Sequence, residues 1–269
     1  MAKRGFSLIE LSIVLVILGL LVGGILVGRS LIRASELRSA TTEFTRYNTA
    51  FLAFRDKYFA LPGDFANATG IWGTDPGGCP GTSATAPTPG SATCNGNGDG
   101  MINAQTANDF YRSWQQLADA GLIEGQFTGV ANSTSWWVRS INIAMPNVPA
   151  SRLGNAAWNV QFVGGQDVTS TYFFDGSYPH VLVLGIASGD PIASAGPLTP
   201  EDAWNIDNKL DDGKPGSGRV LSLKNSNQAN AATGCSNQAY STTVSIAASS
   251  DYLLTNSKPI CALVFKMNF

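Results

Sequence analysis

The feature that most constrains this chain is a long apolar segment close to its start. Phe6 to Gly28 holds 23 residues with a single ionisable side chain, Glu10, and it follows the basic pair Lys3-Arg4. As a helix this segment would be about 34 Å long, which is enough to cross the hydrocarbon core of a bilayer. A cleaved secretory signal has a shorter apolar region and a small-residue cleavage site. We therefore expect a membrane helix that stays in the protein.

Glu10 is the residue that distinguishes a plain membrane anchor from a helix with a more specific role. A carboxylate within a membrane helix is costly unless it has a partner. A cut between Gly5 and Phe6 would create a free amine on Phe6. That amine and the Glu10 carboxylate of a neighbouring chain could then pair in an apolar environment. The residues thus favour side-by-side association of several chains through their N-terminal helices.

The stretch KRGFSLIEL resembles the type III signal of type IV pilins and type II secretion pseudopilins. The resemblance covers residues 3–30 and rests on the basic leader, the Gly5-Phe6 junction, Glu10 and the uninterrupted apolar run. It implies that prepilin peptidase cleaves after Gly5 and methylates Phe6. It also implies that Phe6 and Glu10 serve filament assembly. Many pilins carry a proline partway along this helix, whereas this chain has none before Pro62.

The pattern divides the chain into four parts. We expect a leader at residues 1–5, a transmembrane and assembly helix at 6–28, an amphipathic continuation at 29–61 and a globular head at 62–269. The continuation carries an apolar stripe, with Arg38, Glu43, Arg46 and Asp56 elsewhere on the helix surface. The stripe consists of Ala34, Leu37, Phe44, Tyr47, Phe51, Phe54 and Tyr58. Its default role is packing against the head, and Pro62-Gly63 is the expected end of the helix.

The head is predicted to be α+β. Residues 103–123 and 198–213 each show helical signals, including the Thr199 cap, Pro200 at the first turn and a glycine after each end. Strand-like runs surround them, and their short connections favour an antiparallel sheet behind the long helix, which is also the layout that the resemblance implies. The runs are WWVRSINI, WNVQFV, STYFF, HVLVLGI, VLSL and CALVFKM.

Four cysteines, Cys79, Cys94, Cys235 and Cys261, occur without a CxxC pair. The even number and the export-type N-terminus predict two disulfides outside the cytosol. Three pairings are open, and we favour the sequential one. Residues 73–100, rich in glycine and proline, read as a surface loop closed by the first bridge.

The stretch NGNGDGMI resembles the first half of an EF-type calcium loop. Asn95, Asn97, Asp99 and the Met101 carbonyl would supply the oxygens. The twelfth position is Thr106 rather than a glutamate, so Asp109 would have to compensate. A turn without metal is the alternative.

Asp207, Asp211 and Asp212 form a second acidic cluster at a helix end, where the helix dipole disfavours acids. A cation there, or Lys209 or Lys214, would balance the charge. No cofactor is required by either reading, and structural Ca²⁺ is the only one indicated.

His180 is the only histidine. No partner for a Ser-His-Asp or Cys-His site is evident, so we expect a surface or capped histidine and a chain without enzymatic activity.

We therefore interpret the chain as a structural subunit, a pilin or minor pilin, of a type IV pilus-like filament. A type II secretion pseudopilin is the alternative within that class, and a membrane-tethered binding or hydrolytic ectodomain is the alternative outside it. Expected partners are prepilin peptidase, other pilins and the inner-membrane assembly machinery. The precursor would be a single-pass inner-membrane protein with its head outside the cytosol, later part of a surface pilus or periplasmic pseudopilus. Residues 61–269 hold 15 acidic and 9 basic side chains, which argues against nucleic-acid binding.

Overall fold

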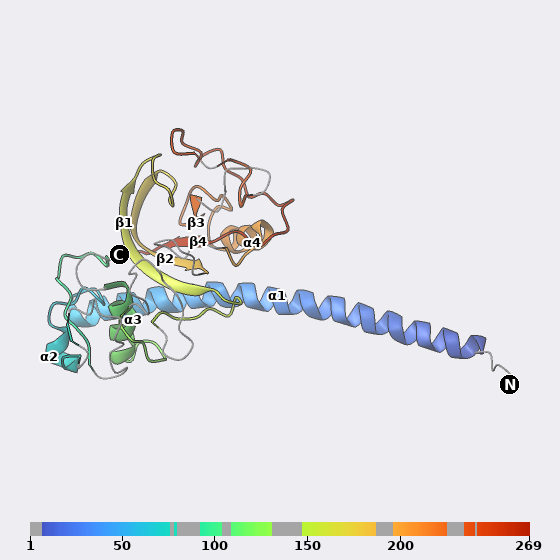
Figure 1. Cartoon of the computed structure of the whole chain (residues 1–269), viewed down its shortest axis with the longest axis horizontal. Coiled ribbons are helices and arrows are strands. Elements are labelled where there is room, and N and C mark those ends of the chain that lie inside the picture. The colour runs from blue at the N-terminus through green and yellow to red at the C-terminus, as the bar shows by residue number, and fades with distance from the viewer. Residues whose placement is uncertain are drawn as a thin grey trace.

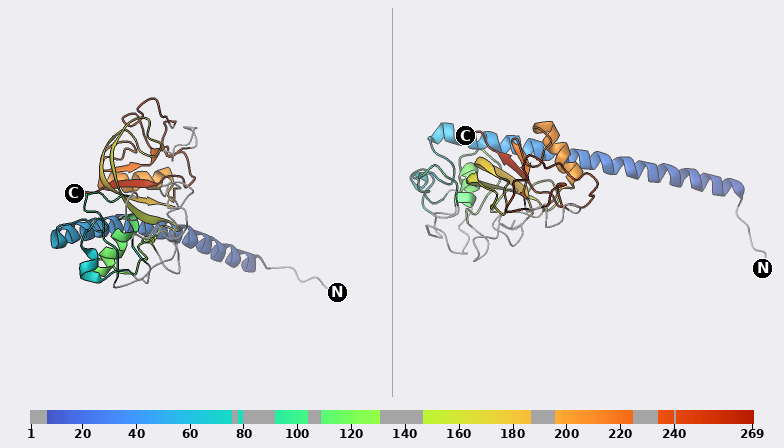
Figure 2. Two further views of the ribbon diagram at one scale, coloured as in Figure 1. Left: turned by 60° about the vertical axis from the view of Figure 1, so that its left-hand side comes forward. Right: turned by 90° about the horizontal axis from the view of Figure 1, so that it is seen from above.

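The computed structural model describes residues 7–75, 78–79, 92–103, 109–130, 147–186, 196–224, 234–239 and 241–269. A long helix, α1, runs through the molecule, and the head is built around its C-terminal half (Figure 1). Two further views agree that the N-terminal half of α1 extends well beyond the head (Figure 2). The predicted α+β layout is therefore present.

Helix α1 spans Leu8–Tyr58, 51 residues, and is about 75 Å long. Ser7 caps its start, since the Ser7 Oγ accepts from the Ile9 N–H. The helix ends where Phe59 adopts a left-handed conformation (φ 54°) and donates its N–H to the Arg55 carbonyl. The predicted continuation to residue 61 is thus wrong, because the chain turns before it reaches Pro62.

The apolar stripe of α1 is the centre of the head. Phe44 stacks on Phe265 of the sheet at 4.7 Å between ring centroids. Tyr47 and Phe51 meet the Trp114 ring edge-on at 5.1 and 5.5 Å. The buried residues of α1 are Leu37, Ala40, Glu43, Phe44, Tyr47, Ala50, Phe51 and Phe54. Tyr58 is half-buried, whereas Ala34 is exposed and does not belong to the packed stripe as predicted.

Four strands form one antiparallel sheet in the order β1-β2-β4-β3. They are β1 (Ala157–Gln166), β2 (Gly176–Gly185), β3 (Val220–Ser222) and β4 (Leu263–Lys266). Alternate residues of a strand point to opposite faces. Leu182 and Phe265 accordingly belong to the core around α1, whereas Val181 and Val264 pack with Phe173 in a second apolar cluster.

Two of the runs predicted to be strands are not among the strands that the structure describes. The run STYFF at 170–174 is not a strand, because turn hydrogen bonds replace a ladder: Ser170 N–H donates to the Asp167 carbonyl, and Phe173 N–H to the Ser170 Oγ. Its apolar character comes from Phe173 and Phe174, which are buried as part of a connection. The run WWVRSINI lies outside the described residues.

The described part of the head also contains three short helices: α2 (Ala68–Trp72), α3 (Asp109–Asp119) and α4 (Pro200–Leu210). Helix α3 corresponds to the first predicted helix of the head, and α4 to the second. The Thr199 hydroxyl accepts from Asp202 N–H at 3.2 Å, as expected of an N-cap. Helix α3 packs on α1, with Trp114 fully buried between them.

A buried carboxylate joins α1 to the head. Glu43 was predicted to lie on the helix surface, and this is wrong, because the Glu43 side chain is nearly enclosed. Its Oε2 accepts from the Ser151 hydroxyl and the Trp158 indole N–H, both at 2.7 Å, and its Oε1 accepts from Arg152 N–H at 3.2 Å. Three donors thus compensate a charge that would otherwise be costly to bury.

His180 is buried within β2 rather than on the surface. Its Nε2 accepts from the Ile102 N–H at 3.1 Å, and its ring lies against Phe162 and Phe269 with centroids 5.3 Å apart in each case. Burial lowers the pKa of His180 to about 4. The histidine therefore acts as a neutral acceptor that holds the 99–103 segment on the sheet.

We predict that Glu43→Ala destabilises the protein by about 3 kcal/mol, because it leaves the Trp158 and Ser151 donors without an acceptor in the core. Glu43→Gln keeps an acceptor oxygen and should cost less. Urea unfolding of the detergent-solubilised protein measures both values. Equal stability of the alanine variant and the parent protein would show that the carboxylate does not hold the head to α1.

We also predict a pH dependence that comes from His180. The unfolded chain binds a proton near pH 6.5 and the folded chain only near pH 4, so this residue makes the protein less stable as pH falls between those values. Other buried groups titrate too, so the test is a comparison. The stability of His180→Gln, which keeps an acceptor for Ile102, should improve relative to the parent by about 1–3 kcal/mol between pH 7 and pH 4.5. A constant difference would refute the assignment.

Candidate functional site

The first half of α1 is an apolar surface that the head leaves uncovered. Among the described residues, α1 is the one helix long and apolar enough to cross a membrane. Its large side chains are exposed from Leu8 to Ile32. At Gly19, Gly23, Gly24 and Gly28 an added Cβ would meet no atom within 4 Å. Another helix, or lipid, can therefore approach this part of α1 closely.

Glu10 lies at the start of this apolar surface. Its Oε2 accepts from the Ser7 N–H at 2.8 Å, which completes a capping box with the Ser7 hydroxyl. Within one chain, then, the carboxylate is partnered by the helix's own free N–H group and is open to the outside. Gly5 and Phe6, the predicted cleavage and methylation site, lie outside the described residues. The pairing of Glu10 with Phe6 of another chain stays a prediction.

An ion-pair cluster marks the place where α1 leaves the head. The Arg33 guanidinium contacts the Asp202 carboxylate at 2.5 Å and the Glu36 carboxylate at 2.9 Å. Burial alone would lower the pKa of Arg33, but the hydrogen bonds to Asp202 and Glu36 outweigh it and raise the pKa. The cluster ties the first turn of α4 to α1. No local sequence pattern indicates this cluster, since Arg33 and Asp202 are 169 residues apart.

A groove of about 390 Å³ lies beside the same helix, between α1 and the segment that precedes β1. Arg38, Arg46 and Arg152 are among the residues that line it, and the Arg46 guanidinium also donates to the Tyr47 hydroxyl at 2.8 Å. The Glu43 carboxylate at its wall is already engaged by three donors. This set of side chains suits the binding of an anionic surface group better than acid–base chemistry.

The residues predicted to bind calcium on the NGNGDGMI stretch do not all converge. The Asn95 Oδ1 accepts from the Thr69 N–H at 2.8 Å and so serves the start of α2. Asn97 Nδ2 donates to Asp99 Oδ2 at 2.7 Å, and Asp99 Oδ1 accepts from Met101 N–H at 2.8 Å. Thr106 lies outside the described residues. Asn97 and Met101 thus contact Asp99 through N–H groups and not through the predicted oxygens, and Asn95 is directed elsewhere, so calcium binding by this stretch stays a prediction.

Asp207, Asp211 and Asp212 do come together. One oxygen from each lies within 4.8 Å of the others, and no other group of three such residues meets this distance among the described residues. Burial, followed by the charges of Asp212 and Asp211, raises the pKa of Asp207 to about 7.

Each of these carboxylates also organises the turn from α4 to β3. Asp207 accepts from the Tyr252 hydroxyl and Gly213 N–H, Asp211 from the N–H groups of Arg219 and Val220, and Asp212 from Lys214 N–H and the Ser217 hydroxyl. A Cβ at Gly218 would lie 1.8 Å from Asp211 Oδ2, so only glycine fits there. This bonding accounts for the acidic residues as parts of a turn, and a metal here stays a prediction.

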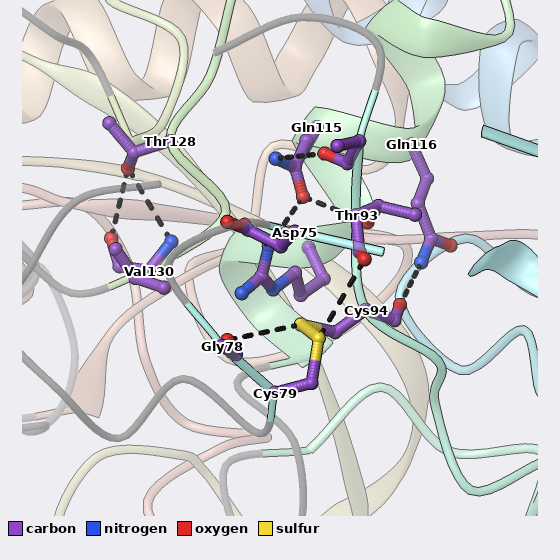
Figure 3. A network of polar contacts seen from close by, with 11 residues as sticks. Asp75, Gly78, Cys79, Thr93, Cys94, Gln115, Gln116, Thr128 and Val130 are labelled. Atoms are coloured by element: carbon purple, nitrogen blue, oxygen red, sulfur yellow. Dashed lines mark hydrogen bonds and ion pairs between the residues drawn. A yellow bond between two sulfur atoms is a disulfide. The ribbon is translucent and has the colours of Figure 1, made fainter. Parts of the chain in front are cut away.

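The two predicted disulfides are present with the sequential pairing, Cys79–Cys94 and Cys235–Cys261. Polar side chains of α3 form hydrogen bonds with the segment that carries Cys94 of the first bridge (Figure 3). Gln116 Nε2 donates to the Cys94 carbonyl, and Thr93 donates its hydroxyl to Gln115. Arg112 pairs with Asp75 at 2.8 Å, and both are fully buried. The surface loop is therefore fastened to the core at its base.

Comparison with known protein families supports the interpretation of the N-terminal segment. Residues 1–26 match the model of the prokaryotic N-terminal methylation motif. No curated protein and no solved structure matches the chain. The motif covers the basic leader, the Gly5-Phe6 junction, Glu10 and most of the apolar half of α1. The chain thus carries the prepilin-type signal of type IV pilins and pseudopilins, ahead of an α+β head.

Proposed function

We propose that this protein is a structural subunit of a type IV pilus-like filament. Prepilin peptidase cuts after Gly5 and methylates Phe6, and the matured chain then assembles through α1. The observation that carries the proposal is an apolar half-helix which the chain's own head leaves uncovered, with one carboxylate at its start. Such a surface is stable in lipid or against other helices. In this proposal α1 of the precursor lies in the membrane, and after assembly it packs against the helices of other subunits.

The head is placed outside the cytosol in this proposal. Two disulfides within one head support that side of the membrane, because cytosolic thiols are kept reduced. The Arg33 cluster supports a stable angle between α1 and the head, since it braces the helix where it leaves the folded part. The same residues would serve a subunit of a secretion pseudopilus, so the tests below address filament assembly itself.

The first prediction concerns processing. The native protein should begin at methylated Phe6, which intact-mass and peptide mass spectrometry will read directly. A bulky acidic substitution, Gly5→Glu, should leave the leader attached. An intact leader on the parent protein in a cell with an active prepilin peptidase would overturn the assignment.

The second prediction concerns Glu10. In a filament core water is scarce, so the Glu10 carboxylate needs a cation, and the Phe6 amine of a neighbouring subunit is the nearest one that the sequence offers. Removing one partner of a buried ion pair costs about 3–5 kcal/mol per pair. We expect Glu10→Ala to give normal membrane levels and normal cleavage but no filaments containing this subunit, as seen by electron microscopy of sheared surface material.

Two further variants separate the roles of Glu10. Glu10→Gln retains an oxygen that can accept from the Ser7 N–H, so it keeps the start of the helix but loses the charge; it should also fail to assemble. Glu10→Asp keeps the charge on a shorter arm and should be partly defective. If Glu10→Gln forms filaments in normal yield, the acid acts as a helix cap and not as an assembly contact.

A further inference from the structure

The basic groove beside α1 is continuous with the apolar half of that helix. A second hollow of about 170 Å³ is lined by Ile32, Ser35, Glu36, Ser39 and Arg152. Three of these residues, Ser35, Ser39 and Arg152, also line the groove of about 390 Å³ described above. Ile32 is the last large apolar side chain in the exposed run of α1. The two hollows therefore lead from an apolar surface to a group of arginines.

Two guanidinium groups of the groove are available to a ligand. Arg38 and Arg152 are exposed, and neither guanidinium forms an ion pair or a hydrogen bond with another residue that the structure describes. Arg46 differs, because it already donates to the Tyr47 hydroxyl. The carboxylate that lines the groove, that of Glu43, is bound by three donors. The groove thus presents positive charge that has no partner in the described part of the chain.

The position of the groove along α1 decides which anion reaches it. The exposed apolar run from Leu8 to Ile32 is about 37 Å long, so in a bilayer with a hydrocarbon core of about 30 Å its end lies at or just beyond the core. Ser35 and Arg38 follow about 5 and 9 Å further along the helix. The headgroup layer on each side of the core is about 5–7 Å thick. Side chains on a helix lean toward its N-terminus, and arginine extends its charged end to the membrane interface. The Arg38 guanidinium therefore lies at the level of the lipid phosphates.

An apolar surface next to free cations matches the two ends of a phospholipid. Acyl chains can lie along the exposed side chains that end at Ile32. Guanidinium groups bind phosphate oxygens through paired, charge-assisted hydrogen bonds. The Ser35 side chain lines both hollows, and a hydroxyl can donate to a further phosphate oxygen. A small soluble anion would use the guanidinium groups alone, whereas a lipid uses the whole length of the two hollows.

We propose that this groove binds the headgroup of an anionic phospholipid in the leaflet on the head's side, while α1 lies in the membrane. Arg38 and Arg152 hold the phosphate, and Ser35 donates to it. The inference rests on the membrane-inserted precursor of the proposed function, but it does not require a filament. Arg38 belongs to α1 and Arg152 to the head, so the bound lipid fixes the head against the membrane surface. Assembly then has to release this lipid.

The acidic surface of a second copy is the competing occupant of the groove. Residues 61–269 hold 15 acidic and 9 basic side chains, so another head could supply carboxylates to the arginines. Such a surface would leave the apolar end of the hollows, at Ile32, without a matching partner. A lipid satisfies both ends, and we therefore assign the groove to a lipid and let the experiment decide between the two.

The experiment measures lipid binding to the full precursor in detergent by native mass spectrometry. Phosphatidylglycerol is compared with zwitterionic phosphatidylcholine that carries the same acyl chains. The parent protein should bind phosphatidylglycerol at least about tenfold more tightly, because only this lipid has a net negative charge to pair with the two arginines.

The test variant is the double substitution Arg38→Gln with Arg152→Gln. It should weaken phosphatidylglycerol binding at least about tenfold and remove the preference over phosphatidylcholine. Both side chains are exposed, and Arg152 contacts Glu43 through its backbone N–H, so the fold does not depend on either guanidinium. An unchanged melting temperature verifies this, and each single variant should lose part of the affinity.

Two control variants complete the design. Arg29→Gln removes an exposed arginine that is nearer to the apolar run but lines neither hollow, and it should leave the affinity nearly unchanged. Glu10→Ala, which should block assembly, should bind phosphatidylglycerol as the parent does. Failure of lipid binding and failure of assembly can thus be told apart.

Four results would overturn the proposal. The first is equal binding of the two lipids by the parent protein. The second is an equal loss of binding in Arg29→Gln and in the double variant, which would indicate general surface charge. The third is displacement of the lipid by an equimolar amount of inorganic phosphate, which would indicate a site for free anions. The fourth is a double variant that binds lipid normally but forms no filaments, which would assign the groove to the acidic surface of another subunit.

Discussion

The structure depends on one helix, α1, whose two halves have different surroundings. The C-terminal half of α1 supplies the aromatic side chains around which the sheet and α3 are packed. The N-terminal half offers apolar side chains that are exposed in the part of the chain that the structure describes. Burial of apolar surface is the largest favourable term in folding and association. The same term that builds the head from one half of α1 therefore requires lipid or other helices around the other half.

Polar groups decide how the head is held on that helix. Glu43 fixes the segment before β1 by accepting from three donors, and Arg33 braces α4 where α1 leaves the head. Arg112 and Asp75 fasten the base of the disulfide loop to α3. Each of these groups is buried or half-buried and is paired, as burial of charge demands. They give the head a defined position relative to α1. A subunit that packs through α1 needs its head in a fixed position on that helix.

Several features could be read from the sequence because local physical chemistry determines them. Helix α4 follows from the Thr199 cap and Pro200. The sequence left three disulfide pairings open, and the structure has the sequential one that was favoured. Other predictions failed for non-local reasons. Glu43 was predicted to be a surface acid, because no residue near it in sequence indicates that the Trp158 indole N–H donates to its carboxylate. Residues 170–174 had a strand's composition but became a connection, because the preceding turn engages their backbone.

The loop at 95–103 shows the same division most clearly. Its glycines and alternating oxygens are visible in the sequence, but Asp64 and Asp109 approach it only because Gly63 and Gly96 let three backbones meet. The sequence by itself determined the signal at the N-terminus, the apolar half-helix and Glu10, because these depend on composition and spacing along one segment. Only the tertiary structure decided which acids are buried, which backbone N–H groups of the loop bind Asp64 and which half of α1 remains uncovered. Those properties depend on contacts between residues far apart in the chain, and no local pattern records them.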